Sequence, residues 1–206
     1  MKRIFAFLLA LALFGANLAF TDENPAFNEV CKSISSHKIT KGNFSQTKMI
    51  KKIMREIKSS GTFIVSANDG VLWNTQKPFK SSMAITKSGI VQTNAHGKKN
   101  VIAAGQNATF EQISALMASL FSGDSDSLDN NFQIEFIGSP QEWNINLVPR
   151  DLSVKNFIES IEMTGRAAID MMILHEPSGD FTKYEFTNQI FADSLTNEEK
   201  SFFSAE

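Results

Sequence analysis

The sequence predicts an α+β fold in which most strands belong to one antiparallel, strongly curved or barrel-like sheet. From Ile39 onward, short segments alternate apolar and polar residues, and turn residues separate each segment from the next. Consecutive hairpins of this kind build an antiparallel sheet. Two other segments have helical spacing, and we expect both helices to pack against the sheet.

The first residues predict an export signal. A short basic start precedes an apolar run, residues 4–14, that is too short to cross about 30 Å of hydrocarbon as a helix. Residues 1–19 are expected to form the signal peptide, and residues 20–206 a single domain with a polar C-terminal tail. Cys31 does not directly follow the apolar run, so we expect no lipid anchor.

Charge and cysteine content exclude several classes of protein. The formal net charge of −2 and the lack of a dense basic cluster give no support to nucleic-acid binding. A single cysteine, Cys31, cannot form an internal disulfide. It is either a buried bystander on the first helix or a site of intermolecular pairing.

The mature chain is expected to begin with a helix. Asn24 is suited to the cap and Pro25 to the first helical position, while Phe27, Val30 and Ile34 fall on one face. The alternating segments that follow are residues 42–52, 53–66, 71–75, 83–86, 90–93, 132–136, 143–147, 158–163, 169–174 and 181–186.

A second helix is predicted where the strands are interrupted. Thr109 and Gln112 fit a capping box, and Gly123 is suited to the end of the helix. Its apolar face is formed by Phe110, Ile113, Leu116, Met117, Leu120 and Phe121. Residues 124–129 are predicted to form an acidic loop, and residues 197–206 a polar helix or tail.

Several motifs, in order along the chain, resemble those of the LolA-like lipoprotein carriers, in particular a divergent subgroup of that family. They are residues 42–48 (GNFSQTK), 61–63 (GTF), 70–73 (GVLW), 77–79 (KPF), 143–150 (WNINLVPR) and the hairpin 169–186 with its Gly179-Asp180 turn. Together they span nearly the whole mature chain. Each is weak alone, and their order is what makes the resemblance specific.

The resemblance implies an incomplete antiparallel β-barrel of about ten or eleven strands, covered by helices, with a hydrophobic cavity. It implies a monomeric periplasmic carrier, without cofactor, that shields the acyl chains of lipoproteins. Cargo would enter from an inner-membrane extraction complex and leave to an outer-membrane acceptor. An acyl chain of about 16 carbons loses on the order of 12 kcal/mol when it enters water, so transfer between two membranes requires such protection.

Two other functions remain open at this point. The carrier could hold a different lipid, such as a glycolipid or an acylated polyene-type product. A non-enzymatic periplasmic interaction protein would instead have a filled core and no apolar ligand.

The cavity is expected to be lined by apolar residues of the strands. They are Phe44, Phe63, Leu72, Trp73, Phe136, Trp143, Ile145 and Met171. Eighteen phenylalanines, eight methionines and one tyrosine suit a loosely specific acyl cavity, although an ordinary core has a similar composition. The helix with Phe110 to Phe121 is expected to be either a lid or part of that core. Lys77 stands where better-known members carry an arginine thought to hold the lid closed, and lysine lacks the planar fork of arginine.

No pattern of an enzyme or metal site emerges. His37, His96 and His175 are far apart, and the sequence contains no nucleophile elbow, phosphate loop or dinucleotide motif. A calcium loop beginning at Asp124 fails because Leu128 and Asp129 replace an oxygen ligand and the required glycine. We therefore expect no catalytic residues, no metal and no cofactor.

The clearest charge feature is the basic stretch of Lys48, Lys51, Lys52 and Arg55. It suits contact with an acidic partner or with anionic lipid headgroups. A solvated outer strand face is the more ordinary explanation, because lysines also protect sheet edges from pairing.

Overall fold

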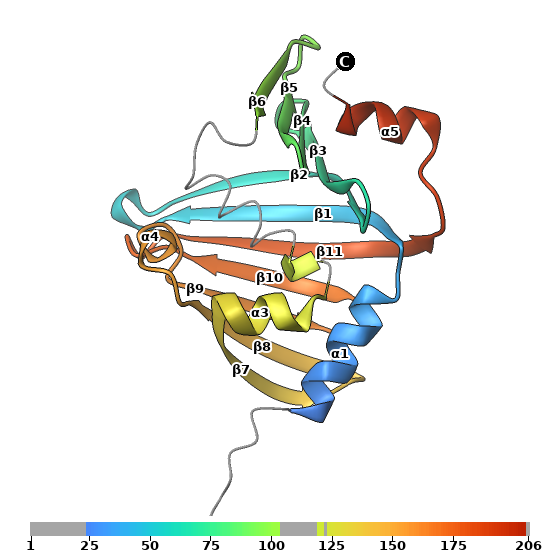
Figure 1. The fold of residues 1–206 in the computed structure, drawn as a ribbon. Coiled ribbons are helices and arrows are strands. Elements are labelled where there is room, and N and C mark those ends of the chain that lie inside the picture. The colour runs from blue at the N-terminus through green and yellow to red at the C-terminus, as the bar shows by residue number, and fades with distance from the viewer. Residues whose placement is uncertain (1–23, 104–118, 122, 205–206) are drawn as a thin grey trace, which may run out of the picture.

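The computed structural model describes residues 24–103, 119–121 and 123–204, and one sheet dominates them (Figure 1). The strands are β1 (Ile39–Ile50), β2 (Arg55–Ser66), β3 (Gly70–Lys77), β4 (Ser81–Thr86), β5 (Gly89–Thr93), β6 (Lys99–Ala103), β7 (Phe132–Ser139), β8 (Glu142–Pro149), β9 (Ser160–Gly165), β10 (Ile169–His175) and β11 (Phe181–Ala192). The helices are α1 (Pro25–Ser35), α3 (Ser125–Asn131), α4 (Leu152–Lys155) and α5 (Asn197–Phe203). The predicted signal peptide lies outside the described residues.

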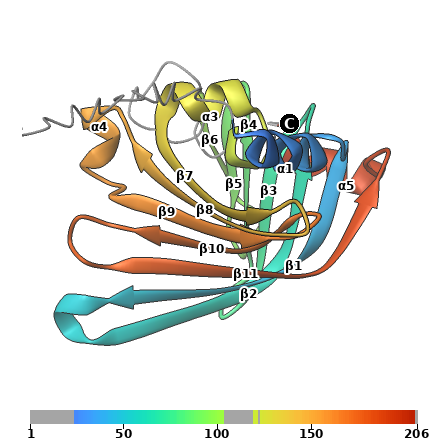
Figure 2. The ribbon, with the colours of Figure 1, turned by 90° about the horizontal axis from the view of Figure 1, so that it is seen from below.

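The strands pair in the order β6-β5-β4-β3-β2-β1-β11-β10-β9-β8-β7, and every pair is antiparallel. The sheet does not close, because β6 and β7 remain at its two edges. It curves so strongly that α1 and α3 lie within the curve (Figure 2). The predicted fold class, an incomplete antiparallel barrel covered by helices, is confirmed.

Side chains on the two faces of the sheet form two separate clusters. The main cluster lies on the concave face and includes Phe44, Phe63, Trp73, Phe132, Trp143, Ile145, Leu147, Ile161, Met163, Met172 and Phe186. The second lies on the convex face of β2 to β5 and consists of Ile39, Ile64, Leu72, Ala84, Val91 and Leu195. Successive side chains of a strand point to opposite faces of the sheet, so neighbouring residues belong to different clusters.

Helix α1 begins as the sequence predicts. The Asn24 side chain accepts hydrogen bonds from the backbone N–H groups of Ala26 and Phe27, at 3.1 and 3.3 Å, and Pro25 occupies the first helical position. Its buried face enters the main cluster, where Phe27 contacts Phe136 edge to face with ring centroids 6.0 Å apart. No helix of the described ranges is both long and apolar enough to cross a membrane.

The predicted acidic loop at residues 124–129 is wrong, because the structure forms helix α3 there. Asp124 caps this helix by accepting a hydrogen bond from the backbone N–H of Ser127 at 3.2 Å. Leu128 is the buried residue of α3 and joins the main cluster. Burial of this one side chain outweighs the poor helix propensity of the surrounding Ser, Asp and Asn residues.

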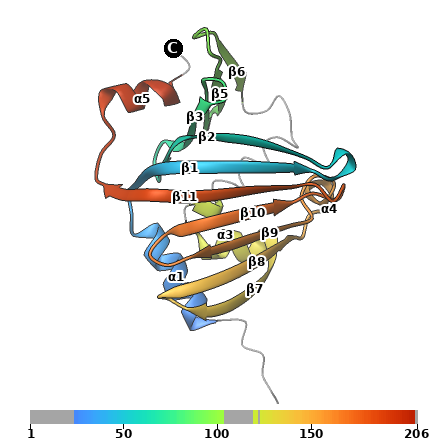
Figure 3. The ribbon, with the colours of Figure 1, turned by 180° about the vertical axis from the view of Figure 1, so that it is seen from behind.

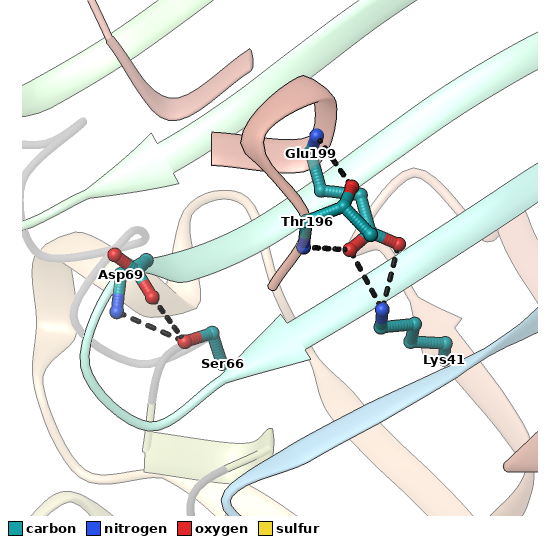
Figure 4. A network of polar contacts seen from close by, with 5 residues as sticks. All are labelled: Lys41, Ser66, Asp69, Thr196 and Glu199. Atoms are coloured by element: carbon teal, nitrogen blue, oxygen red, sulfur yellow. Dashed lines mark hydrogen bonds and ion pairs between the residues drawn. The ribbon is translucent and has the colours of Figure 1, made fainter. Parts of the chain in front are cut away.

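Helix α5 returns across the outside of the sheet (Figure 3). Phe202 and Phe203 pack against the second cluster, so the predicted polar tail has an apolar face. Figure 4 shows how its first turn is held: both carboxylate oxygens of Glu199 accept hydrogen bonds from Lys41 at 2.7 Å. Glu199 and Thr196 also form a reciprocal capping box.

Candidate functional site

The concave face has a filled half and a hollow half. In the filled half, β7, β8 and β9 pack against α1 and α3, and Phe132, Trp143 and Leu147 are almost completely buried. In the hollow half, formed by β3, β4 and β5 with neighbouring parts of β1, β10 and β11, the structure contains a cavity of about 570 Å³. This volume lies in the range of roughly 300–1,000 Å³ that is typical of small-molecule sites.

The walls of the cavity are mostly apolar. They are formed by Trp73, Met83, Ile85, Ile90, Leu174 and Tyr184. The register explains how they meet, because Trp73 pairs with Met83, and Ile85 pairs with Ile90, across neighbouring strands. Directly paired residues point to the same face of a sheet, so β3, β4 and β5 present one continuous apolar surface.

Polar but uncharged side chains complete the lining. They are Gln46, Thr75, Ser81, Ser82, Gln92, Thr93 and Asn94. Of the lining residues within the described chain, none carries a charge at neutral pH. Lys48 and Glu176 form an ion pair at 2.8 Å, and each lies two residues beyond a lining residue along its strand or the turn that follows it. The cavity therefore favours an uncharged, mainly apolar ligand.

An aromatic cluster separates the hollow half from the filled half. Phe121 contacts Trp73 and Phe186 edge to face, with ring centroids 5.5 and 6.0 Å apart. Tyr184 contacts Trp73 at 6.1 Å and stacks parallel to Phe186 at 6.3 Å. Phe121, in the helical residues 119–121, thus packs against Trp73, which lines the cavity.

Two residues of this cluster, Trp73 and Tyr184, carry polar groups and line the cavity. The indole N–H of Trp73 is buried and has no hydrogen-bond partner among the described residues. Burial raises the pKa of Tyr184 to about 12, and the negative charge of Glu176 acts in the same direction. Tyr184 therefore stays neutral at physiological pH, and its hydroxyl adds no charge to the cavity.

The sequence profile described as "Outer membrane lipoprotein carrier protein LolA" matches residues 35–202. The chain belongs to the LolA family. This match covers β1 to α5 and therefore includes both halves of the concave face. No curated protein sequence matches the chain significantly.

Solved structures similar to this LolA-family chain are distant in sequence. NE2245, a LolA superfamily protein from Nitrosomonas europaea, aligns over 88% of this chain and 98% of its own, with 7% identity and a TM-score of 0.48. A DUF1329 family protein from Desulfovibrio piger aligns over 87% of this chain and 96% of its own, with 9% identity and a TM-score of 0.47. The MucA/MucB complex of Pseudomonas aeruginosa aligns over 87% of this chain and 59% of the matched chain, with 11% identity and a TM-score of 0.47.

Eight residues of this LolA-family chain were predicted to line its cavity. Six of them belong to the main cluster of the concave face or pack against it. They are Phe44, Phe63, Trp73, Phe136, Trp143 and Ile145. Trp73 is the one that borders the cavity of about 570 Å³. Phe63 borders a much smaller void of about 20 Å³ beside Phe121 and Phe186.

The two remaining predictions have the wrong parity. Leu72 lies in the second cluster on the convex face, because it is adjacent to Trp73 on β3 and successive side chains point to opposite faces. Met172, not Met171, is fully buried in the main cluster. The pairing of β9 with β10 shifts register between Ile169 and Met171, and a period-two count across this irregularity gives the wrong face.

Sequence reasoning missed most of the actual lining. Met83, Ile85 and Ile90 lay in predicted strands, but Leu174 and Tyr184 come from the distant closing hairpin. The short turn between β3 and β4 was a usable signal in the sequence, because strands joined by a short turn pair with each other. That pairing places Met83 beside Trp73. Nothing in the local pattern indicated that β11 would pair with β1 and so bring β10 near the cavity.

The predicted lid and latch are only partly within the described chain. Phe110, Ile113, Leu116 and Met117 lie outside the described residues. Leu120 and Phe121 are buried in the main cluster. Lys77, at the end of β3, is exposed and forms no ion pair with a described residue.

Proposed function

We propose that this protein is a periplasmic carrier that shields the acyl chains of lipoproteins during transfer from the inner to the outer membrane. The observation that carries the proposal is the uncharged cavity of about 570 Å³ on the concave face of a LolA-family chain. An acyl chain gains about 0.8 kcal/mol for each methylene removed from water, so an apolar wall of this extent binds it without any specific contact.

The mechanism is exclusion of water without covalent chemistry or a cofactor. Trp73, Met83 and Ile85 present smooth apolar surface, and methionine adapts its shape to chains of different length and branching. Gln46 and Gln92 border the same cavity and offer amide groups to the polar end of an acylated cargo. No group of acidic, histidine or cysteine residues within the described ranges is arranged to hold a metal ion.

The proposal assigns the covering of the cavity to the segment that ends at Phe121. Phe121, the described end of that segment, contacts Trp73, which lines the cavity. Lys77 remains the proposed latch for a closed lid. We propose that the carrier is a monomer, exported by the signal peptide at residues 1–19.

The proposed partners are an inner-membrane extraction complex that loads the carrier and an outer-membrane acceptor that unloads it. The cargo is the acylated lipoprotein itself. A glycolipid or another acylated product is the alternative cargo that the same cavity would accept.

The test is displacement of a fluorescent fatty-acid probe from the mature protein. Acylated lipoprotein, free lipid and the unacylated lipoprotein body are the three competitors. Met83→Asp places a charge in the cavity wall, while Met171→Asp places the same charge at a half-buried methionine outside the main cluster and the cavity lining. We expect M83D to weaken probe binding at least ten-fold and M171D to leave it nearly unchanged.

Each competitor gives a distinct result. Displacement by the acylated lipoprotein but not by its unacylated body is the expected outcome. Displacement by free lipid with no response to the lipoprotein would favour the alternative cargo. If no probe binds to the folded protein, the carrier proposal fails and an interaction protein becomes the better explanation.

A further inference from the structure

The turn that joins β1 and β2 projects from one end of the sheet and combines exposed apolar side chains with basic ones. We call Lys51, Lys52, Ile53, Met54 and Arg55 the basic tip. The side chains of Ile53 and Met54 are 59% and 80% exposed. Met54 adopts a left-handed backbone conformation in this turn, with φ of 50°.

The charges of the basic tip are not neutralised by ion pairs. The neighbouring Lys48 pairs with Glu176, and Lys58 pairs with Glu56. Asp180 accepts a hydrogen bond from the backbone N–H of Lys51 at 2.9 Å and is the remaining acidic neighbour. Within the described chain, the side chains of Lys51, Lys52 and Arg55 have no ion-pair partner.

Other exposed apolar residues gather at the same end of the molecule. Figures 1 and 3 show the β1–β2 turn and α4 at one end of the sheet. Five of the ten large exposed apolar side chains of the described chain belong to this end: Ile53, Met54, Ile57, Leu152 and Phe157. Around α4 the charges are mixed, with Asp151, Lys155 and Glu159, so the positive potential comes from the basic tip.

The concave face connects the basic tip to the cavity. Ile57 pairs with Lys48, and the next residue pair on the same face is Ser59 with Gln46, which lines the cavity. Ile57 is 48% exposed beside the ion pair of Lys48 and Glu176. Ile57 is therefore an exposed apolar residue that lies on the concave face between the turn and the pair Gln46–Ser59 at the cavity.

We propose that the basic tip docks the protein on an anionic phospholipid surface. Ile53 and Met54 enter the region between headgroups and acyl chains, and Lys51, Lys52 and Arg55 lie against lipid phosphates. A fluid bilayer moulds itself around such a protrusion, whereas a protein partner would need a preformed acidic pocket. Two apolar side chains and three cations give weak, salt-sensitive binding, which allows the protein to leave the membrane again. Docking does not depend on what the cavity holds.

The test is flotation of the mature protein with vesicles of phosphatidylglycerol mixed with phosphatidylcholine, and with vesicles of phosphatidylcholine alone. Each cation near an anionic surface contributes about a five-fold factor, so Lys52→Gln with Arg55→Gln should lower partitioning about 25-fold. Ile53→Ser with Met54→Ser should lower it about ten-fold or more. All four positions are exposed, so these variants are expected to stay folded.

Matched controls change the same chemistry away from the basic tip. Lys87→Gln with Lys98→Gln removes two exposed positive charges from β-turns elsewhere, and Ile137→Ser removes an isoleucine that is 74% exposed near the far end of β7. Both controls should partition within about two-fold of the unchanged protein. Equal losses in the controls and in the tip variants would overturn the proposal.

A fluorophore measures insertion directly. Met54→Cys can be labelled with an environment-sensitive dye, because the native Cys31 is buried. We expect a blue shift on anionic vesicles for the label at Met54 and none for a label at Ile137→Cys. If the unchanged protein fails to bind anionic vesicles while the tip variants still impair cargo transfer, the tip contacts a protein and the lipid proposal is wrong. Probe binding in the cavity is measured separately, so its loss or survival does not affect this result.

Discussion

The filled and hollow halves of the concave face are built from the same alternating strands, yet one forms a core and the other a cavity. In the filled half, α1 and α3 supply Val30 and Leu128 to cover Trp143 and its neighbours. In the hollow half, Trp73, Met83 and Ile85 face a space of about 570 Å³. The strand pattern therefore determines which apolar side chains point inward. The segments that cover the sheet determine whether these side chains are packed in a core or remain available to a ligand.

The largest expected effect is on stability in the filled half. Trp143→Ala should lower the free energy of unfolding by about 3–5 kcal/mol, because it empties a fully enclosed site and removes the hydrogen bond from the indole N–H to the Arg166 carbonyl oxygen at 2.8 Å. Met83→Ala should lower it by about 1 kcal/mol, since Met83 already borders open space. Urea denaturation of both variants measures the difference. Equal losses would show that the two halves are packed alike.

A smaller loss of stability is expected at α5, which packs against the convex face of the sheet behind the hollow half. Burial opposes the charge of Glu199, but the hydrogen bond and charge of Lys41 and the bonds from Thr196 outweigh it and hold the pKa of Glu199 below its usual value of 4.5. The ionised carboxylate therefore stabilises the fold above about pH 4.5, and this contribution is lost as the pH falls through the lower folded-state pKa. Glu199→Gln should cost about 1 kcal/mol at pH 7.

The pH dependence provides the control for Glu199. Denaturation curves of the unchanged protein and E199Q should converge in acid and separate above pH 4.5. A constant difference at every pH would mean that the carboxylate charge is not what holds α5.

The smallest expected effect is on the reactivity of the Cys31 thiol, which is buried on α1 in the filled half. Burial raises the pKa of the Cys31 thiol to about 12, and the negative charges of Asp129 and Asp124 act in the same direction. The thiol should therefore react with a disulfide reagent at pH 8 only when α1 opens, and its labelling rate should follow unfolding. Rapid labelling of the native protein would show that the filled half opens readily.

Local chemistry predicted much of the fold. Asn24 and Pro25 determined the start of α1, and period-two alternation located ten of the eleven strands. The short edge strand β6 has too few alternating residues to stand out. Helices α3 and α4 were not predicted, because the Ser, Asp and Asn residues in and beside them indicate loops. The burial of Leu128 and Val154 and the side-chain caps of Asp124 and Asp151 stabilise them.

The candidate site was less predictable because it depends on contacts between distant segments. Leu72 and Trp73 were both predicted to face the cavity, although adjacent residues of a strand point to opposite faces; the curvature of the whole sheet determines that Trp73 is the one facing inward. Tyr184 and Leu174 reach the cavity because β11 pairs with β1. That pairing joins the two ends of the domain, and no local pattern encodes it.

The central claim, that acyl chains bind in the hollow half, is tested most directly by fluorescence quenching with a bromine-labelled fatty acid. Trp73 borders the cavity, whereas Trp143 lies in the filled half, and each can be observed alone in the variants Trp143→Phe and Trp73→Phe. We expect strong, saturable quenching when only Trp73 remains and little when only Trp143 remains. Equal quenching of both tryptophans, or quenching of Trp143 alone, would contradict it.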